Sequence, residues 1–169
     1  MRAKSNSKKE GEMATREELM GGFQFVPAQA KRVAGILDDH GAWDTRRPQG
    51  WTPKEMFTHV AVVAGFIPAM GPAMLAAPPE ADIVGGMDIA AVNDQGVKSM
   101  AAMDTKQIVD ALNTNYSNLS NFVKGLTDEQ LDSKHTFLGM PITASDLLMT
   151  LTVMHSVHHL YEAPLPVSV

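Results

Sequence analysis

The sequence WTPKEMFTHVA at residues 51–61 contains the clearest helix start in the chain. Thr52 and Glu55 have the spacing of a capping box, in which each side chain accepts a hydrogen bond from a backbone N–H of the first turn. Pro53 occupies the first helical position, where the missing N–H of proline costs nothing. Apolar residues follow at helical spacing, so we predict a helix that begins at Pro53 and fades over residues 72–78.

Similar start signals divide the rest of the chain into helices. We predict long helices from Thr15 to about Asp39, from Asp104 to about Gly125 and from Thr143 to about Tyr161, a short helix at residues 127–130 and one or two helical turns within residues 88–100. Gly21, Gly22 and Pro27 are expected to bend or interrupt the first helix.

Four long helices and one long connection at residues 78–103 indicate the fold class. No run of alternating apolar and polar residues is convincing, and residues 136–142 are expected to form at most a short extended stretch around Gly139. The sequence therefore predicts an all-α four-helix bundle with a long crossover connection between helices 2 and 3.

The composition is that of one globular domain. The chain has 169 residues, of which 44% are hydrophobic and 20% charged, and its net charge is −5. Interspersed charges do not predict a nucleic-acid surface. The absence of cysteine excludes disulfides, thiolate ligands from the chain and a cysteine nucleophile, and favours the cytoplasm. We predict a disordered tail at residues 1–13 and a helical bundle domain at residues 14–169.

Residues 60–77 contain no polar or charged side chain, and 18 such residues reach the lower limit of a membrane span. Gly65, Pro68 and Pro72 interrupt this run, and mean hydropathy over the chain is −0.09. A buried bundle helix explains the run better than a membrane span, so no membrane association is predicted.

Three of the six histidines lie within five residues on the last predicted helix: His155, His158 and His159. Residues four apart share a helical face, so His155 and His159 can present two imidazoles to one ion. His158 could pair with His155 instead, since residues three apart are also neighbours. The apolar stripe that contains Leu148 and Leu151 continues to His155 and His159, which favours this pair.

His59 lies on the apolar helix that begins at Pro53, where a single histidine is more commonly a hydrogen-bonded core residue than a ligand. Together with His155 and His159 it makes three imidazoles, the number of protein ligands found in open catalytic zinc sites. The metalloprotease motif His-Glu-x-x-His is absent, because no glutamate stands between His155 and His159. We predict a divalent metal site formed by His59, His155 and His159.

Three sequence features resemble the DinB-like superfamily of metal-binding four-helix bundles, especially the branch that includes mycothiol-dependent maleylpyruvate isomerases. Residues 51–61 resemble its Trp-Thr-x-x-(Asp/Glu)-x-x-x-His-x-Ala motif, residues 88–93 its asparagine-bearing segment, and His155-x-x-x-His159 its last helix. The resemblance implies an up-down-down-up bundle in which His59, His155 and His159 bind zinc or nickel. One departure is Leu160-Tyr161, which stands where the family often has Gly-Gln.

The resemblance also implies chemistry with a low-molecular-weight thiol. A free thiol has a pKa near 8.5, whereas coordination to a divalent cation deprotonates it. Because the chain has no cysteine, the sulfur must come from a small molecule such as mycothiol or bacillithiol. We therefore predict a metal-dependent transferase that adds such a thiol to an electrophilic small-molecule substrate. We also predict a homodimer, because bundles of this size commonly associate with closed twofold symmetry.

Two alternative functions use the same three histidines. A metal-assisted hydrolase would activate water, with Glu162 as the nearest carboxylate in sequence. A non-catalytic metal-binding or stress-response module would need no substrate at the metal.

The surroundings of the histidines are predicted from a few polar and aromatic residues. At least one of Glu55, Asn93 and Glu162 is expected to accept a hydrogen bond from a metal-bound imidazole. Trp43 is expected to pack against the bundle. Trp51 has two interpretations, packing against the bundle, which we favour, and forming a wall of the site.

Overall fold

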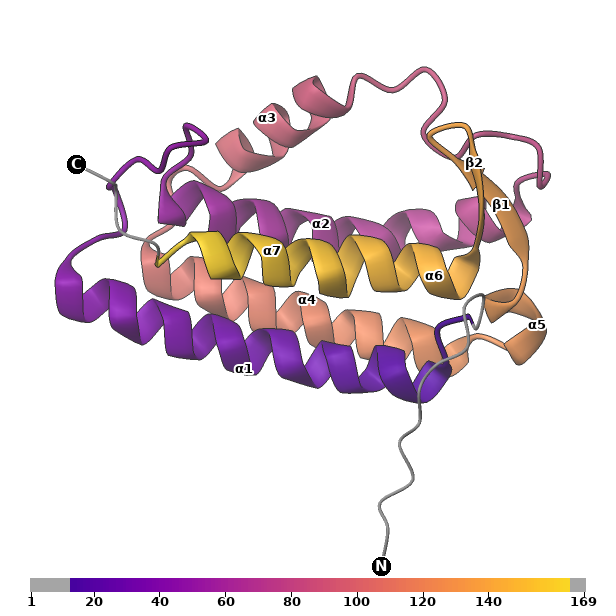
Figure 1. Cartoon of the computed structure of the whole chain (residues 1–169), viewed down its shortest axis with the longest axis horizontal. Helices are drawn as coiled ribbons and strands as arrows, with labels where there is room; N and C mark the ends of the chain where they lie inside the picture. Colours follow the sequence, from indigo (N-terminus) through magenta and orange to yellow (C-terminus); the bar gives the residue numbers. More distant parts are fainter. Residues whose placement is uncertain (1–12, 165–169) are drawn as a thin grey trace, which may run out of the picture.

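The computed structural model describes residues 13–164, so the predicted tail at residues 1–13 lies outside it except for Met13. Four long helical rods lie side by side (Figure 1). They are α1 (Arg16–His40), α2 (Pro53–Ala76), α4 (Thr105–Gly125) and a composite of α6 (Ala144–Leu148), the π-helical turn η1 (Met149–Met154) and α7 (His155–Glu162). Shorter elements connect them: α3 (Ile89–Ser99), α5 (Asp128–Leu131), β1 (Lys134–Phe137) and β2 (Met140–Thr143). The predicted four-helix bundle is confirmed.

The direction of the rods explains the long crossover. In Figure 1, α1 and the α6–α7 rod run one way, and α2 and α4 run the other way. Two consecutive parallel rods cannot be joined by a tight turn, because the chain must first return along the length of the bundle. Residues 77–104 make this return, and α3 lies within them. The up-down-down-up order is the one that the resemblance implies.

The predicted capping boxes open the helices. The Glu55 carboxylate accepts a hydrogen bond from the Thr52 N–H at 2.7 Å, and the Thr52 hydroxyl accepts one from the Glu55 N–H at 3.2 Å. Reciprocal pairs of the same kind open α1, α4 and α5. The predicted interruption of α1 is not observed, since one helix continues through Pro27 to His40.

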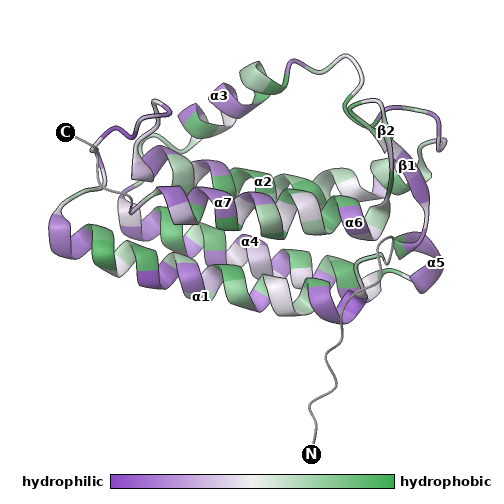
Figure 2. Cartoon of the chain, in the orientation of Figure 1, coloured by the Kyte–Doolittle hydropathy of each residue, from purple (hydrophilic) through white to green (hydrophobic). Residues whose placement is uncertain are grey.

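α2 is the one helix, within residues 13–164, that is long and apolar enough to span a membrane, a property that core helices of soluble proteins share. It packs against α4, α3 and α7. Phe57, Val60 and Ala61 are fully buried, and most of the ribbon of α2 is hydrophobic in Figure 2. The first half of α2 is therefore a core helix of the bundle, as predicted.

A β-hairpin replaces the short extended stretch that the sequence predicted. β1 and β2 pair antiparallel, and the turn residues Leu138 and Gly139 both have positive φ, of 51° and 75°. Two such residues are typical of the type I′ turn, whose twist matches that of the strands. The Asp82 carboxylate accepts hydrogen bonds from the N–H groups of Leu138, at 3.2 Å, and Gly139, at 2.8 Å. These bonds attach the crossover to the hairpin.

The last rod differs from the regular helix predicted over residues 143–161. The inserted π-helical turn η1 separates α6 from α7. The buried stripe is Leu148, Thr152, Ser156 and Leu160, and not the stripe through Leu151 and His155 that even helical spacing suggested. Two members of this stripe are polar, and each has a hydrogen-bond partner.

Tyr116 of α4 supplies that partner from across the core. Its hydroxyl group donates to the Thr152 carbonyl oxygen and lies 2.7 Å from Ser156 Oγ. The Thr152 hydroxyl donates to the Leu148 carbonyl at 2.6 Å. This buried network connects α4 to the rod at the junction of η1 and α7, next to His155.

Replacing Tyr116 by Phe should destabilise the protein by about 1–3 kcal/mol, because the Thr152 carbonyl and the Ser156 hydroxyl lose a buried partner. Urea unfolding at equilibrium measures this free energy. The control is Tyr161→Phe, since Tyr161 is 71% exposed and should tolerate the change. Equal stability of the two variants would contradict the structural role of the network.

Candidate metal centre

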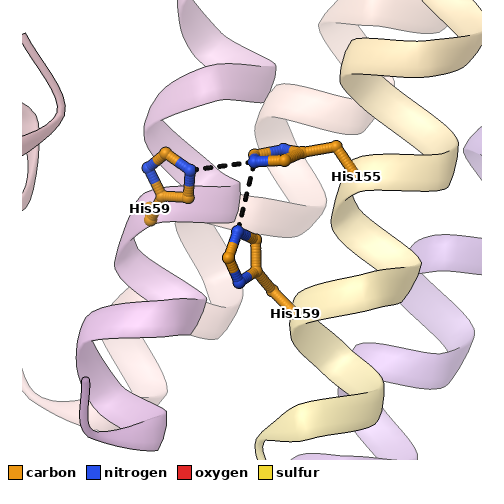
Figure 3. Close-up of side chains that lie close together, drawn as sticks. All are labelled: His59, His155 and His159. Atoms are coloured by element: carbon orange, nitrogen blue, oxygen red, sulfur yellow. Dashed lines mark hydrogen bonds between the residues drawn. The ribbon is translucent and has the colours of Figure 1, made fainter. Parts of the chain in front are cut away.

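The structure brings together the three histidines that the sequence selected (Figure 3). His59 projects from α2, and His155 and His159 project from successive turns of α7. The Nε2 atom of His155 lies 3.1 Å from Nε2 of His59 and 3.1 Å from Nε2 of His159. All three side chains can place a ligand atom within 4.8 Å of the others. Such a spacing is what ligands of one ion at about 2.0–2.1 Å require.

Hydrogen bonds alone leave this cluster unsatisfied. A neutral imidazole carries one proton, so it has one donor nitrogen and one acceptor nitrogen. The Nδ1 atoms of His59, His155 and His159 are buried, and none makes a well-formed hydrogen bond within residues 13–164, although the Leu151 carbonyl acts on the ring of His155. The three Nε2 atoms face one another instead. Three basic nitrogens directed at a common point fit a divalent cation, which accepts all three lone pairs.

Burial keeps the imidazoles of the cluster uncharged. Burial removes water from the His59 ring, and electrostatic repulsion from His155 adds to this effect. Together they lower the pKa of His59 from 6.5 to about 4. Desolvation and the neighbouring histidines lower the pKa of His159 to about 3. Desolvation also lowers the pKa of His155, against a weaker opposite effect from the Leu151 carbonyl. Each ring is therefore neutral at neutral pH and has one free lone pair, which Nε2 offers when Nδ1 carries the proton, as a metal ligand must.

Trp51 forms one wall of the cluster. Its ring stacks on the ring of His159, with centroids 5.7 Å apart and planes 10° apart, and it meets the ring of His59 edge-on at 4.9 Å. Both interpretations of Trp51 thus hold, since it packs against the bundle through the histidines themselves. Trp43 packs as predicted: it is buried against Phe57, and its Nε1–H donates to Asp38 at 2.6 Å.

His158 lies outside the cluster. Its side chain is 62% exposed, and its Nε2 lies 3.4 Å from the Glu162 carboxylate. His158, His159 and Glu162 form a second group with ligand atoms within 4.8 Å, but this group lies at the surface and shares His159 with the first. The buried group of three imidazoles is the better candidate because its nitrogens have no other partner.

Glu162 is the nearest of the three predicted hydrogen-bond acceptors. One carboxylate oxygen lies 3.8 Å from Nδ1 of His159, beyond hydrogen-bond distance, and the same oxygen accepts a hydrogen bond from Gln49. Glu55 is engaged in the capping box of α2, and Asn93 lines a separate cavity. The expected hydrogen bond from at least one of these three residues is therefore not formed, although Glu162 faces Nδ1 of His159, and the Leu151 backbone carbonyl acts on the ring of His155.

The fold and the cluster together define a four-helix bundle with a candidate metal centre of three histidines. No protein-family model and no curated protein matches the chain. Two solved structures are similar in fold. YfiT from Bacillus subtilis, described as a probable metal-dependent hydrolase with an unusual four-helix bundle topology, has a TM-score of 0.68 and 19% identity, and the match covers 92% of this chain and 89% of that one.

The second similar structure is a mutant of the mycothiol-dependent maleylpyruvate isomerase. Its TM-score is 0.68 at 12% identity, and the match covers 90% of this chain but 62% of the isomerase. This chain therefore spans less than two thirds of the isomerase. The two neighbours confirm the resemblance predicted from the sequence at the level of the fold.

Acid should destabilise the metal-free protein through these histidines. In the unfolded chain a histidine has a pKa of about 6.5, so between pH 6.5 and about 4 it binds protons that folded His59 and His159 do not. The free energy of unfolding therefore falls as the pH falls through this window, by at most about 1.4 kcal/mol per pH unit and histidine. Replacing His159 by Gln should reduce the slope, measured by urea unfolding at several pH values. An unchanged slope would contradict the lowered pKa.

Proposed function

We propose that this protein is a metal-dependent enzyme in which His59, His155 and His159 hold one divalent ion, zinc or nickel. The observation that carries the proposal is the convergence of the Nε2 atoms of three uncharged imidazoles, one buried and two half-buried, whose buried Nδ1 atoms make no well-formed hydrogen bond. Three protein ligands leave coordination positions for a substrate, whereas structural zinc sites generally use four. Metal-dependent chemistry is also named for YfiT, one of the two neighbours in fold.

We propose further that the reaction is the addition of a low-molecular-weight thiol to an electrophilic small molecule. A bound divalent ion supplies the positive charge that stabilises the thiolate over the thiol. In an addition, the S–H bond breaks, an S–C bond forms and the proton passes to the electrophile; where the electrophile carries a leaving group such as chloride, that group departs with its bonding electrons and the proton passes to solvent. The chain contributes no sulfur of its own because it lacks cysteine. Its histidines position the sulfur, and the indole of Trp51 shields one side of the cluster from water.

The position of Glu162 favours thiol chemistry over hydrolysis. An Asp or Glu beside the water molecule at the open coordination position would favour hydrolysis, because it can accept the proton of that water. The Glu162 carboxylate faces Nδ1 of His159, whereas Nε2 faces the shared centre. No carboxylate from residues 13–164 joins the group of His59, His155 and His159. Glu162 is therefore suited to orient the His159 ring, and the metal-assisted hydrolase named for YfiT is the second candidate.

The third candidate, a non-catalytic metal-binding or stress-response module, requires the same ion without turnover.

The cytoplasm is the expected location. Its reducing conditions keep a small thiol reduced, and the chain, which lacks cysteine, has no disulfide that would need an oxidising compartment.

Metal binding should depend on three of the six histidines. The purified protein should bind one equivalent of zinc or nickel, and replacing His59, His155 or His159 by Ala should abolish binding at micromolar metal, as measured by equilibrium dialysis. The matched control is His158→Ala, on the same helix and next to His159, which should bind normally. If His158→Ala loses the metal and His59→Ala retains it, the ion occupies the surface group that contains Glu162.

Activity measurements should separate the three candidate functions. The zinc-loaded protein should consume 1-chloro-2,4-dinitrobenzene in the presence of mycothiol, bacillithiol or cysteine, and His59→Ala should lose this activity while His158→Ala retains it. Hydrolysis of 4-nitrophenyl acetate without any thiol would favour the hydrolase. Metal binding without either reaction would favour the non-catalytic module.

We also propose a homodimer that forms through α1 and α7. Phe25 and Ile36 of α1 and Tyr161 of α7 are exposed apolar residues that line one shallow groove. Burying such surface against a second copy would stabilise a closed twofold dimer. Phe25→Glu should shift sedimentation at micromolar protein from dimer to monomer, whereas Gln24→Glu, an exposed neighbour, should not. A monomeric wild-type protein would refute the dimer.

A further inference from the structure

A second feature of the bundle is an apolar cavity of about 160 Å³ beneath the crossover. α2 forms its floor, and its other walls come from residues 83–93, the hairpin and the α6–η1 rod. In Figure 1 this region lies between α3, the hairpin and the second half of α2. A dry apolar cavity of about 150 Å³ in another protein holds one benzene molecule. The cavity therefore has room for an apolar group of about six carbon atoms.

The lining of the cavity is suited to hydrocarbon. None of its side chains is charged, and Asn93 is the only one that is polar. Several of the apolar side chains remain partly open to solvent, with Phe66 43% and Val92 44% exposed. No other part of residues 13–164 covers these apolar side chains. An apolar ligand that removes them from water would therefore lower the free energy of the complex.

The crossover is fixed in place as a wall of this cavity. A Cβ atom added at Gly96 would lie 2.7 Å from Val62 Cγ1, so α3 approaches α2 as closely as a glycine allows. At the other end, the Asp82 carboxylate binds the two turn residues of the hairpin, and the Ile83 N–H donates to the Thr136 carbonyl at 2.9 Å. These contacts hold the crossover against the bundle, so the cavity is a fixed feature of the fold.

The cavity begins about one helical turn from the candidate metal centre along both helices that carry the histidines. Val63 lines the cavity and lies four residues after His59 on α2. Leu151 lines it too and lies four residues before His155 on the last rod. Because α2 and the last rod run in opposite directions, both steps lead the same way along the bundle, away from the loop that contains Trp51 (Figure 1). Residues four apart lie about one helical turn apart on the same face.

We propose that this cavity binds the apolar part of the substrate, an alkyl chain or a single aromatic ring of about six carbons, whose polar reactive end lies at His59, His155 and His159. The proposal rests on the proposed function, because the histidine cluster is taken as the reacting end. The chain thereby selects small electrophiles with one polar and one apolar end over fully polar ones.

The test uses straight-chain alkanoates from acetate to decanoate as probes. Isothermal titration calorimetry of the zinc-loaded protein should show affinity that rises about fourfold with each added methylene, until the chain has about six carbons, and then levels off. The heat-capacity change of binding should become more negative over the same range of lengths.

Substitutions on the floor and roof of the cavity test its role. Met70→Glu on α2 introduces a charge into the lining and should remove the dependence on chain length, whereas Ala69→Glu, an exposed neighbour outside the lining, should preserve it. Val92→Glu and Ala91→Glu form the same comparison on α3, where both positions are exposed and the fold tolerates charge. His59→Ala should weaken all probes by a similar factor and leave the dependence on length intact.

The possible failures are distinguishable. Two results would overturn the cavity proposal and leave the proposed metal enzyme standing. In the first, the protein binds zinc, and the zinc-loaded protein binds alkanoates of every length with the same affinity. In the second, the dependence of affinity on chain length survives both Met70→Glu and Val92→Glu. A protein that binds no metal would refute the proposed function and, with it, the place of the reactive end. A dimer that Met70→Glu dissociates would show that a second copy covers the cavity, and would also overturn the proposal.

Discussion

Three imidazole nitrogens meet at the centre of the cluster formed by His59, His155 and His159, and within residues 13–164 no well-formed hydrogen bond engages the buried Nδ1 atom of any of the three rings. Burial keeps each ring uncharged, because a charged imidazole would lose its hydration. Each neutral ring has one N–H group and one lone pair. When the Nδ1 atoms carry the protons, the lone pairs of the three Nε2 atoms face one another. A cation relieves this conflict, and the proposed chemistry follows from the positive charge that it brings.

The bundle topology is what places these three side chains together. His59 and His155 are 96 residues apart, and they meet because α2 and the α6–α7 rod pack side by side in opposite directions. The long crossover makes this arrangement possible, since it allows α2 and α4 to run parallel. The same crossover roofs the apolar cavity beside the cluster. One topological feature thus generates both the candidate metal centre and the proposed binding cavity.

The elements that could be predicted from sequence were those specified by local interactions. Capping boxes such as Thr52 with Glu55 involve residues three apart, and they predicted the starts of α1, α2 and α4 correctly, as the Thr143 N-cap did for the last rod. The i,i+4 spacing of His155 and His159 is equally local. His59 was harder to place, because its role depends on a partner helix; it was included because it completes a set of three imidazoles, and the resemblance to a known family supported that choice.

The features that escaped prediction depend on contacts between distant residues. The π-helical turn η1 leaves no pattern in the sequence, and it shifts the buried stripe from Leu151 to Thr152. Tyr116 was overlooked because its partners lie 36 and 40 residues away. Asp82 lies in the crossover with no local signal in the sequence, and its carboxylate binds the turn of the hairpin more than 50 residues away. Tyr116 and Asp82 acquire their roles only because the fold brings residues that are distant in sequence next to them.

The central claim is that the three histidines ligate one ion and leave part of its coordination sphere open. X-ray absorption spectroscopy of the zinc-loaded protein at the zinc edge tests this directly. The account predicts about three nitrogen scatterers at about 2.0–2.1 Å with the outer-shell pattern of imidazole, and a sulfur scatterer at about 2.3 Å after a small thiol is added. A first shell of oxygen atoms alone, or a shell of four imidazoles that added thiol does not change, would contradict it.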